Sequence, residues 1–340
     1  MNHKIRFGVV GTNFITDWVI AGAREDERFE LAAVCSRTQE RGAEFAAKHN
    51  IPHIFTSLDD MVQSDIIDAV YIASPNYKHA EQSILAMSHG KHVLCEKPIA
   101  SNAREARAMV AASHKYGVTL MEAMKSTLSP NFIAVKDNLH RIGTPRRYFA
   151  SFCQYSSRYD KFKEGIILNA FRPELSNGAM MDIGVYTLYP LIALFGSPKS
   201  VNAQGIVLSS GVDGQGAVNM QYDGMNATVL YSKIANSQLP AEIEGEDGNI
   251  MIDRIQTPVD VRFYPRQAPA SGHEKRAEGE SLTGADNHNE YFYEIKEFID
   301  LIEQGRRESS INSHQCSIAT MEVIDEVRRQ LGVRYPADEA

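Results

Sequence analysis

The first 123 residues alternate short apolar runs with helical patterns, and this alternation constrains the fold more than any other feature. The apolar runs predict buried strands at Ile5–Val10, Leu31–Cys35, His53–Phe55, Ala69–Ala73, His92–Cys95 and Thr119–Met121. Helices are predicted between them at Phe14–Ala23, Gln39–His49, Leu58–Gln63, Lys78–Ser88 and Ala103–Tyr116. Such alternation builds right-handed βαβ units. Residues 1–123 are therefore expected to form an α/β domain around a doubly wound parallel sheet.

After residue 123 the pattern changes to longer segments with a period of two. These predict strands at Arg147–Gln154, Ser200–Leu208, Ala217–Tyr222, Ala227–Ile234, Ala241–Glu246, Ile250–Asp253 and Val259–Tyr264. Helices are predicted from Ser129-Pro130 to Gly143, and at Glu290–Gln304 and Cys316–Leu331. Residues 124–340 are therefore expected to form an α+β domain with a large, mostly antiparallel, open sheet. The polar segment 265–287 is predicted to be a surface loop, and the last helix to pack back on the first domain.

Composition excludes several classes of protein. An ordinary hydrophobic fraction of 43% with 23% charged residues excludes disorder. The formal net charge of −8 argues against nucleic acid and anionic membranes as partners. No apolar run has the length of a membrane span or a signal peptide. The four cysteines and eleven histidines show no metal-ligand spacing, so no metal and a cytoplasmic location are expected.

The first predicted strand ends in Gly11-Thr12-Asn13-Phe14-Ile15-Thr16, where a dinucleotide fingerprint GxGxxG would stand. Such a turn directs backbone amides at a helix N-terminus toward a pyrophosphate. Gly11 matches the pattern, whereas Asn13 and Thr16 replace its second and third glycines. Asn tolerates a left-handed backbone, which would preserve the turn. A plain strand-to-helix turn is the alternative interpretation.

The end of the second strand bears on the choice of coenzyme. NAD enzymes often carry an acid there that binds the ribose 2′-hydroxyl. This chain instead has Ser36 and Arg37, with Arg41 one helical turn further on. A hydroxyl and two guanidinium groups suit a 2′-phosphate, so NADP(H) is expected to be preferred, with NAD(H) possible. A solvated helix start is the alternative.

Polar residues also follow the strands at Ala69–Ala73 and His92–Cys95. The first is followed by Ser74, Pro75 and Asn76, with His79 three residues on, and the second by Glu96-Lys97-Pro98. Ligands of open α/β sheets bind outside the carboxyl ends of strands, so both segments fall where a ligand is expected. A surface ion pair in a loop is the alternative for Glu96 and Lys97.

Together these segments resemble the Gfo/Idh/MocA oxidoreductase family, with Glu96-Lys97-Pro98 as the most specific motif. The segment from Asn177 to Tyr186 resembles the family's Gly-rich turn leading into a helix with an Asp and, four residues later, a His or Tyr. The tyrosine at 186 places the chain nearer the glucose–fructose oxidoreductase and dimeric dihydrodiol dehydrogenase branch. The resemblance implies a Rossmann-type first domain and spans nearly the whole chain.

The resemblance also implies site residues. Lys97, Asp182 and Tyr186 would be catalytic, and Arg172 would touch cofactor or substrate. With these, the candidate cofactor-binding residues are Gly11, Thr12, Asn13, Phe14, Ile15, Ser36, Arg37, Arg41, Ser74, Pro75, Asn76, His79, Glu96, Lys97 and Arg172. For Asp182 and Tyr186, a helix cap and a core residue are the alternatives. A YxxxK sequence from Tyr159 to Lys163 lacks the serine and glycine turn of short-chain dehydrogenases and is interpreted as chance.

The leading hypothesis is therefore an NADP(H)-dependent oxidoreductase acting on the CH–OH group of a sugar, polyol or related diol or carbonyl compound. A catalytically inactive NADP(H)-binding sensor, suggested by Asn13, and an NAD-dependent glycosidase of the same family are the alternatives. The expected partners are a small-molecule substrate and further copies of the same chain. The resemblance to the family implies that the open sheet forms the subunit interface of a homodimer or homotetramer. Substrate identity and the direction of hydride transfer do not follow from the residues.

Overall fold

The structure is a computed structural model that describes residues 4–266 and 278–339. The chain divides into two compact units. The first comprises residues up to Lys125, 288–321 and the end from Ala337, and the second comprises 126–287 and 322–336. The change at residue 125 lies close to the expected boundary at 123. Residues 288–321 join the first unit, because the apolar side of a late helix packs on the first helix of the chain.

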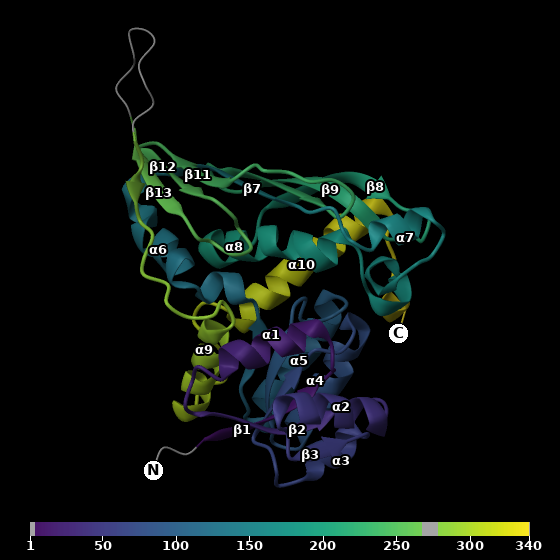
Figure 1. Ribbon diagram of the computed structural model, residues 1–340. Helices are drawn as coiled ribbons and strands as arrows, with labels where there is room; N and C mark the ends of the chain where they lie inside the picture. Colours follow the sequence, from purple (N-terminus) through teal and green to yellow (C-terminus); the bar gives the residue numbers. More distant parts are fainter. Residues whose placement is uncertain (1–3, 267–277, 340) are drawn as a thin grey trace, which may run out of the picture. The chain divides into compact units, whose positions relative to one another are not determined.

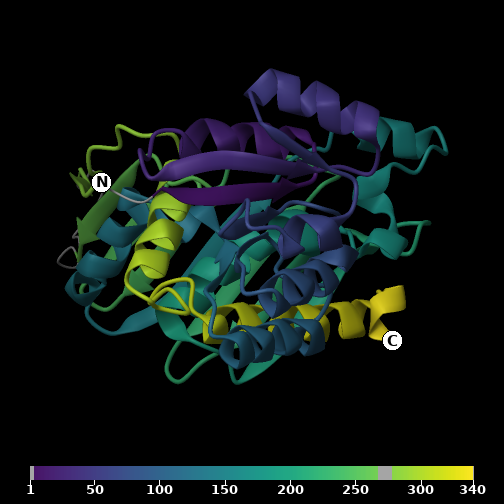
Figure 2. The ribbon, with the colours of Figure 1, turned by 90° about the horizontal axis from the view of Figure 1, so that it is seen from below.

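The first unit contains a six-stranded parallel sheet in the order β3-β2-β1-β4-β5-β6, which confirms the expected doubly wound topology. Its strands are β1 (Ile5–Val10), β2 (Phe29–Cys35), β3 (His53–Phe55), β4 (Ala69–Ile72), β5 (His92–Glu96) and β6 (Leu120–Ala123). Its helices are α1 (Phe14–Ala23), α2 (Gln39–His49), α3 (Leu58–Gln63), α4 (His79–Ser88), α5 (Ala103–Tyr116) and α9 (Phe292–Glu303). α1 and α9 lie on one face of the sheet and α4 and α5 on the other (Figures 1 and 2).

The second unit contains an eight-stranded sheet in the order β14-β13-β12-β11-β7-β10-β9-β8. Among the strands that the structure describes in this sheet, only the β7–β10 pair is parallel, which confirms the expected, mostly antiparallel sheet. The strands are β7 (Pro145–Cys153), β8 (Ser200–Val207), β9 (Asp213–Gln221), β10 (Asn226–Ser232), β11 (Ala241–Gly245), β12 (Gly248–Ile252), β13 (Val261–Pro265) and β14 (Glu280–Ser281). β14 lies inside the segment 265–287 that was predicted to be a loop, and residues 267–277 of that segment lie outside the described residues.

Helices of the second unit pack on one face of this sheet. They are α6 (Pro130–Asn138) and α8 (Val185–Phe195), and α10 (His314–Leu331) contributes its second half. The short helix α7 (Tyr159–Lys163) has no buried residue. α8 lies along the sheet (Figure 1), and the Tyr148 hydroxyl of β7 donates to the Thr187 carbonyl at 3.0 Å. Among the described residues, Pro173–Phe195 alone is long and apolar enough to cross a membrane, but 72% of its most apolar window is buried in the protein. It is a core segment.

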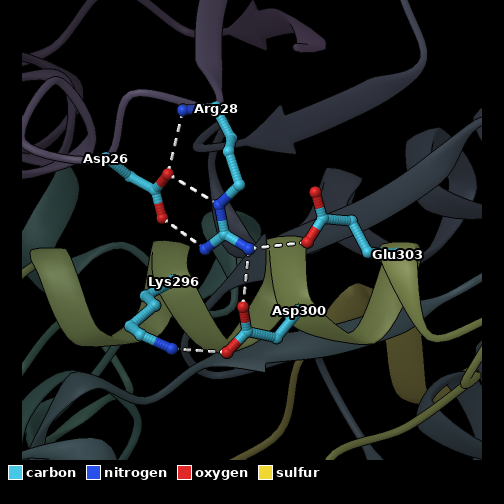
Figure 3. A network of polar contacts seen from close by, with 5 residues as sticks. All are labelled: Asp26, Arg28, Lys296, Asp300 and Glu303. Carbon is cyan, nitrogen blue, oxygen red and sulfur yellow. Dashed lines mark hydrogen bonds and ion pairs between the residues drawn. The ribbon is translucent and has the colours of Figure 1, made fainter. Parts of the chain in front are cut away.

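A charged cluster ties the turn before β2 to α9 within the first unit (Figure 3). Arg28 donates to the Asp26 carboxylate at 2.6 and 2.9 Å, and to Asp300 and Glu303 at 2.7 Å each. Lys296 donates to the other Asp300 oxygen at 2.6 Å. Burial alone would raise the pKa of Asp26, but the Arg28 hydrogen bonds and charge outweigh it, so that pKa lies below its usual value.

We expect Arg28→Met to destabilise the protein by about 1–3 kcal/mol at neutral pH, because the buried Asp26 carboxylate would lose its cation. The loss should shrink as pH falls through the lowered Asp26 pKa, since protonated Asp26 needs no partner. Urea unfolding at pH 7 and pH 3.5 measures both effects. Arg262→Met, which removes an exposed pair with Asp260, is the matched control and should cost less than about 1 kcal/mol. Equal losses in the two variants would contradict a stabilising role for the cluster.

Candidate active site

The turn after β1 requires glycine at its first position. Gly11 has a φ of +105°, and a Cβ placed there would lie 2.6 Å from the Ala73 carbonyl oxygen at the end of β4. Its N–H donates to the Cys35 carbonyl of β2 at 3.3 Å. Gly11 therefore brings the carboxyl ends of β1, β2 and β4 together, as a dinucleotide turn does.

Asn13 supports this turn in a way the sequence analysis did not predict. Its φ of −100° is extended, so the expectation that it relies on a left-handed backbone is wrong. Asn13 is instead the N-cap of α1: its Oδ1 accepts from the N–H groups of Ile15 (2.9 Å) and Thr16 (3.3 Å). Its Nδ2 donates to the Ala73 carbonyl at 2.8 Å. The Asn13 side chain, at the position of the second glycine, thus stabilises the turn by linking the start of α1 to the residue that follows β4.

The other residues of the turn divide between its interior and its surface. Thr16, at the third glycine position, is buried, and its hydroxyl donates to the Gly11 carbonyl at 3.0 Å. Thr12 is half-buried, while Phe14 is exposed and lies edge-on to Trp18, with ring centroids 5.0 Å apart. Trp18 is the single tryptophan of the chain. It lies one helical turn from the candidate coenzyme turn and offers a fluorescence probe of that site.

The end of β2 presents the two arginines at the surface. Ser36 is buried, and its N–H donates to the Phe55 carbonyl at 3.0 Å. Thr38 caps α2 by accepting from the Arg41 N–H at 3.3 Å. Arg37 and Arg41 are exposed, and no ion pair to another described residue engages either guanidinium. Two guanidinium groups without an acidic partner suit a phosphate dianion.

His79 joins the two polar segments that follow β4 and β5. Its ring is buried, with Nδ1 2.9 Å from the Pro98 carbonyl oxygen and Nε2 2.9 Å from the Ser74 carbonyl oxygen. Burial lowers the pKa of His79 more than these carbonyls raise it, so the ring is neutral and donates to one of them. His79 therefore holds the Ser74 and Lys97 segments together, while Pro75 is exposed and Asn76 half-buried.

Glu96 lies buried beneath Lys97. It accepts from the Tyr71 hydroxyl at 2.6 Å and from the Lys97 backbone N–H at 3.2 Å, and the Lys97–Pro98 peptide is cis. Burial raises the pKa of Glu96, against the lowering effects of Tyr71 and Lys97. The Lys97 side chain is half-buried, and it is held at the carboxyl end of β5 by its neighbours on both sides.

Two further buried glutamates, Glu122 and Glu294, lie close enough to Glu96 for its charge to affect their pKa values. The sequence analysis did not identify either of them. Glu122 of β6 accepts from the Ile99 N–H at 3.0 Å, and burial raises its pKa to about 7. Glu294 of α9 is fully buried, and neither carboxylate oxygen has a hydrogen-bond partner among the described residues. Burial, followed by the charge of Glu96, raises its pKa well above the usual value. Single acids inside apolar sequence carry no local pattern that would have revealed this cluster.

In the second unit, Asp182 lies on a π-helical turn, Met180–Gly184, that leads directly into α8. The buried Asp213 carboxylate anchors this turn by accepting from the N–H groups of Ala179 (3.1 Å) and Met180 (2.7 Å). Gly178 is required there, since a Cβ would lie 2.2 Å from the Asp213 carboxylate. Single π-helical turns occur frequently at functional sites.

Asp182 is ion-paired with Lys233, a residue the sequence analysis did not single out. The Lys233 side chain is only 4% exposed, while that of Asp182 is 36% exposed. One sequence signal was available: Ala227, Val229 and Tyr231 alternate inward along β10, and Lys233 continues that alternation. The helix-cap interpretation of Asp182 does not describe this geometry, because its carboxylate pairs with a side chain from the sheet.

The remaining second-unit candidates lie on neighbouring elements. Tyr186 is half-buried at the start of α8, edge-on to Phe152 with ring centroids 5.8 Å apart. Arg172 is exposed and lies 3.5 Å from the Glu174 carboxylate. Tyr159 packs among Tyr155, Phe162 and Phe171, and Lys163 pairs with Asp160, as expected of a chance YxxxK sequence. Over the described residues, no group of three or more potential metal ligands is assembled.

Each unit therefore gathers its own set of candidate residues. In the first unit, hydrogen bonds join the Gly11 turn, the Ser74 segment and the Glu96-Lys97-Pro98 segment at the carboxyl edge of the sheet. Arg37 and Arg41 follow β2 at the same edge. In the second unit, Asp182, Tyr186 and Lys233 gather around the turn before α8. The Gly11 turn, where a Cβ would clash with Ala73, and the Arg37 and Arg41 guanidinium groups, which pair with no acid among the described residues, fit a phosphorylated dinucleotide.

Comparison with known families agrees with this geometry. Residues 5–124 match the Gfo/Idh/MocA oxidoreductase family, NAD-binding Rossmann fold, and residues 138–251 match the C-terminal domain of the same family. The chain belongs to the Gfo/Idh/MocA family. It is an NAD(P)-dependent oxidoreductase acting on CH–OH groups, as the sequence analysis expected.

Relatives of known name refine the position of this oxidoreductase within the family. The chain is 52% identical to the NADP(+)-dependent scyllo-inositol 2-dehydrogenase of Bacillus subtilis, over 99% of this chain and all of that protein. It is 30% identical to the trans-1,2-dihydrobenzene-1,2-diol dehydrogenase of Xenopus tropicalis, over 90% of this chain and 91% of that protein. Its fold resembles the aldose–aldose oxidoreductase of Caulobacter crescentus, with a TM-score of 0.81 at 22% identity, over 96% of this chain and 97% of that one.

Proposed function

We propose that this oxidoreductase is an NADP(H)-dependent dehydrogenase of inositol-like cyclic polyols, with residues 1–123 binding the coenzyme and 124–340 contributing the substrate side. The observation that carries the proposal is the 52% identity, over essentially the whole chain, to an NADP(+)-dependent scyllo-inositol 2-dehydrogenase. The partly exposed side chain of Asp182 supports it, because a carboxylate is a strong acceptor for the hydroxyl groups in which a polyol is rich.

In this proposal, oxidation of a hydroxyl removes a hydride from carbon and a proton from oxygen. The acceptor for that hydride would be supplied by the coenzyme when it is bound. Lys97 and Tyr186 hold and move the proton on the substrate oxygen, and Asp182 accepts a hydrogen bond from another hydroxyl. Asn13, which suggested an inactive sensor, caps α1 and completes the turn, so it gives no reason to expect lost activity.

Coenzyme contacts are proposed at the carboxyl edge of the first sheet. The 2′-phosphate is assigned to Ser36, Arg37 and Arg41. The pyrophosphate and nicotinamide are assigned to residues of the three turns, with His79 in a positioning role: Gly11, Thr12, Asn13, Phe14, Ile15, Ser74, Pro75, Asn76, Glu96 and Lys97. Arg172 of the second unit is a further candidate contact.

The test is turnover by the purified protein with NADP+ or NAD+ and a panel of scyllo-inositol, other inositols, glucose and a trans-dihydrobenzenediol. We expect an inositol to have the highest kcat/KM, with NADP+ as the better coenzyme. Coenzyme binding without turnover of any polyol in either direction would reject the proposal.

We expect Arg37→Asp to weaken NADPH binding by about one to two decades while NADH binding changes little. The reason is that a charge-assisted hydrogen bond contributes about 1.5–3 kcal/mol and an acid would also repel the 2′-phosphate. Quenching of Trp18 fluorescence measures both dissociation constants. Arg254→Asp makes the same charge change on an exposed residue of the second unit and is the control. Equal loss of both coenzymes would remove Arg37 from the 2′-phosphate site.

We also propose that the chain forms a homodimer or homotetramer through the open sheet of the second unit. At the edge strand β8, Ile206 and Val207 are 49% and 41% exposed, which favours coverage by another surface. Light scattering coupled to gel filtration at micromolar concentration tests this proposal, and a single species of monomer mass would contradict it.

A cytoplasmic location is proposed on the state of the cysteines. Cys35, Cys95, Cys153 and Cys316 are all free thiols, as expected in a reducing compartment. Fractionation of cells producing the protein, with activity measured in each fraction, tests this assignment. Recovery in an oxidising compartment would contradict it.

A further inference from the structure

Lys233 stands out because its ammonium group is buried in the second unit. It follows β10 at an inward position, after Ala227, Val229 and Tyr231, which are each at most 1% exposed. Lysine side chains are almost never fully buried unless they are paired, since an unpaired buried charge is strongly unfavourable. Placing lysine in a core position therefore calls for a specific anionic partner.

That partner is Asp182. The Lys233 ammonium donates to Asp182 Oδ2 and lies 5.3 Å from the centre of the Phe171 ring, where a cation is also attracted to the ring face. The backbone of Lys233 is held on both sides, because its N–H donates to the Gly214 carbonyl and its carbonyl accepts from the Ser156 N–H, both at 2.8 Å. The cation is thus presented from a rigid position.

Asp182 differs from an ordinary buried partner in being 36% exposed while its cation is 4% exposed. Its backbone is fixed by the π-helical turn that Asp213 anchors. The Asp182 side chain is thus held by a buried cation while about a third of its surface is exposed, so a ligand can reach it. An anchor for the fold alone would not need an exposed side chain.

We infer that Lys233 is a positioning residue for catalysis: its ammonium group fixes the Asp182 carboxylate to accept a hydrogen bond from one hydroxyl of the polyol substrate. Lys233 transfers no proton and does not touch the coenzyme. The inference deepens the proposed function, on which Asp182's contact with substrate rests. It makes Lys233 a determinant of selectivity for substrates that carry a hydroxyl at that position.

The kinetic test compares Lys233→Met with Lys233→Arg on an inositol and on its monodeoxy analogues. We expect Lys233→Met to raise KM for the inositol by about 10–100-fold, the value of one charge-assisted hydrogen bond, with kcat within about threefold of wild type. Lys233→Arg should recover a substantial part of this loss because it restores the cation. For the analogue that lacks the hydroxyl held by Asp182, the wild type and Lys233→Met should have nearly equal KM values.

The matched control is Lys199→Met, which removes a lysine from an exposed pair with Asp223 in the same unit and should leave kinetics unchanged. Melting temperature and the NADPH dissociation constant are measured for every variant. A Lys233→Met protein with wild-type KM for every polyol would overturn the inference. So would a loss confined to kcat and melting temperature that Lys233→Arg does not repair.

A second readout needs no turnover and separates this inference from the proposed function. Carbodiimide-dependent amidation followed by mass spectrometry reports how readily each carboxyl group reacts. We expect Asp182 to react at least about threefold faster in Lys233→Met than in wild type, because the Lys233 ammonium no longer covers the Asp182 carboxylate, while Asp223 stays unchanged. Unchanged Asp182 reactivity overturns the inference even if polyols are oxidised. Increased reactivity in a protein that oxidises no polyol rejects only the proposed substrate.

Discussion

Lys97→Met is expected to lower kcat by about 10²–10⁴-fold, the usual loss when a general acid–base group is removed, while NADPH binds nearly as tightly as before. The Lys97 backbone is held by Glu96, and the adjoining Pro98 carbonyl is held by His79, so exchanging the side chain leaves its support in place. Steady-state kinetics with an inositol and Trp18 fluorescence titration with NADPH measure the two quantities separately.

Tyr186→Phe should lose turnover in the same range, because its phenol is the second member of the proposed acid–base pair. The double variant should be little worse than either single variant, since groups that act as a unit are strongly non-additive. Glu96 stays in place in all three proteins. Near wild-type kcat in Tyr186→Phe would reduce the tyrosine to a packing residue beside Phe152 and leave Lys97 as the only proton carrier.

We expect Glu122→Gln to raise the free energy of unfolding relative to wild type more at pH 8 than at pH 5. The difference between the two pH values should be about 3 kcal/mol. Burial raises the pKa of Glu122 from 4.5 to about 7, with Glu96 adding to the shift and Lys97 opposing it. Between those two values the unfolded chain releases a proton that the folded protein keeps, so wild-type stability falls as pH rises. Above pH 7 the full cost is present, and a neutral amide of similar shape avoids it.

Urea unfolding of wild type and Glu122→Gln at pH 5, 6.5 and 8 tests this expectation. The glutamine can still accept from the Ile99 N–H, so the variant is expected to fold. Glu44→Gln changes an exposed carboxyl on α2 and should leave the pH dependence of stability unchanged. A constant difference between wild type and Glu122→Gln across this pH range would show that Glu122 titrates as an ordinary carboxyl.

Local signals predicted the secondary structure well because they act over a few residues. The helix predicted at Ala103–Tyr116 has local signals at both ends: the Asn102 side chain caps it by accepting from the Glu105 N–H at 2.9 Å, and Gly117 ends it at a φ of +70°. The short strand β14 was missed because its pairing with β13 is a long-range contact without a hydrophobic pattern of its own. Residues 288–321 were assigned to the second domain because the packing of α9 on α1 is a long-range contact that the local pattern of α9 does not encode.

Periodicity and the order of motifs were enough to predict a doubly wound domain, a mostly antiparallel partner domain, the Gly11 turn and the Glu96-Lys97-Pro98 segment. Each of these depends on residues that are close in sequence. Only the folded chain shows that Asn13 acts as a cap, that Glu96, Glu122 and Glu294 share one buried environment, and that Lys233 pairs with Asp182. The last pair is 51 residues apart, and Arg28 reaches Asp300 across 272 residues. Burial and long-range pairing set the charge and direction of a side chain, and neither is encoded in its immediate sequence neighbours.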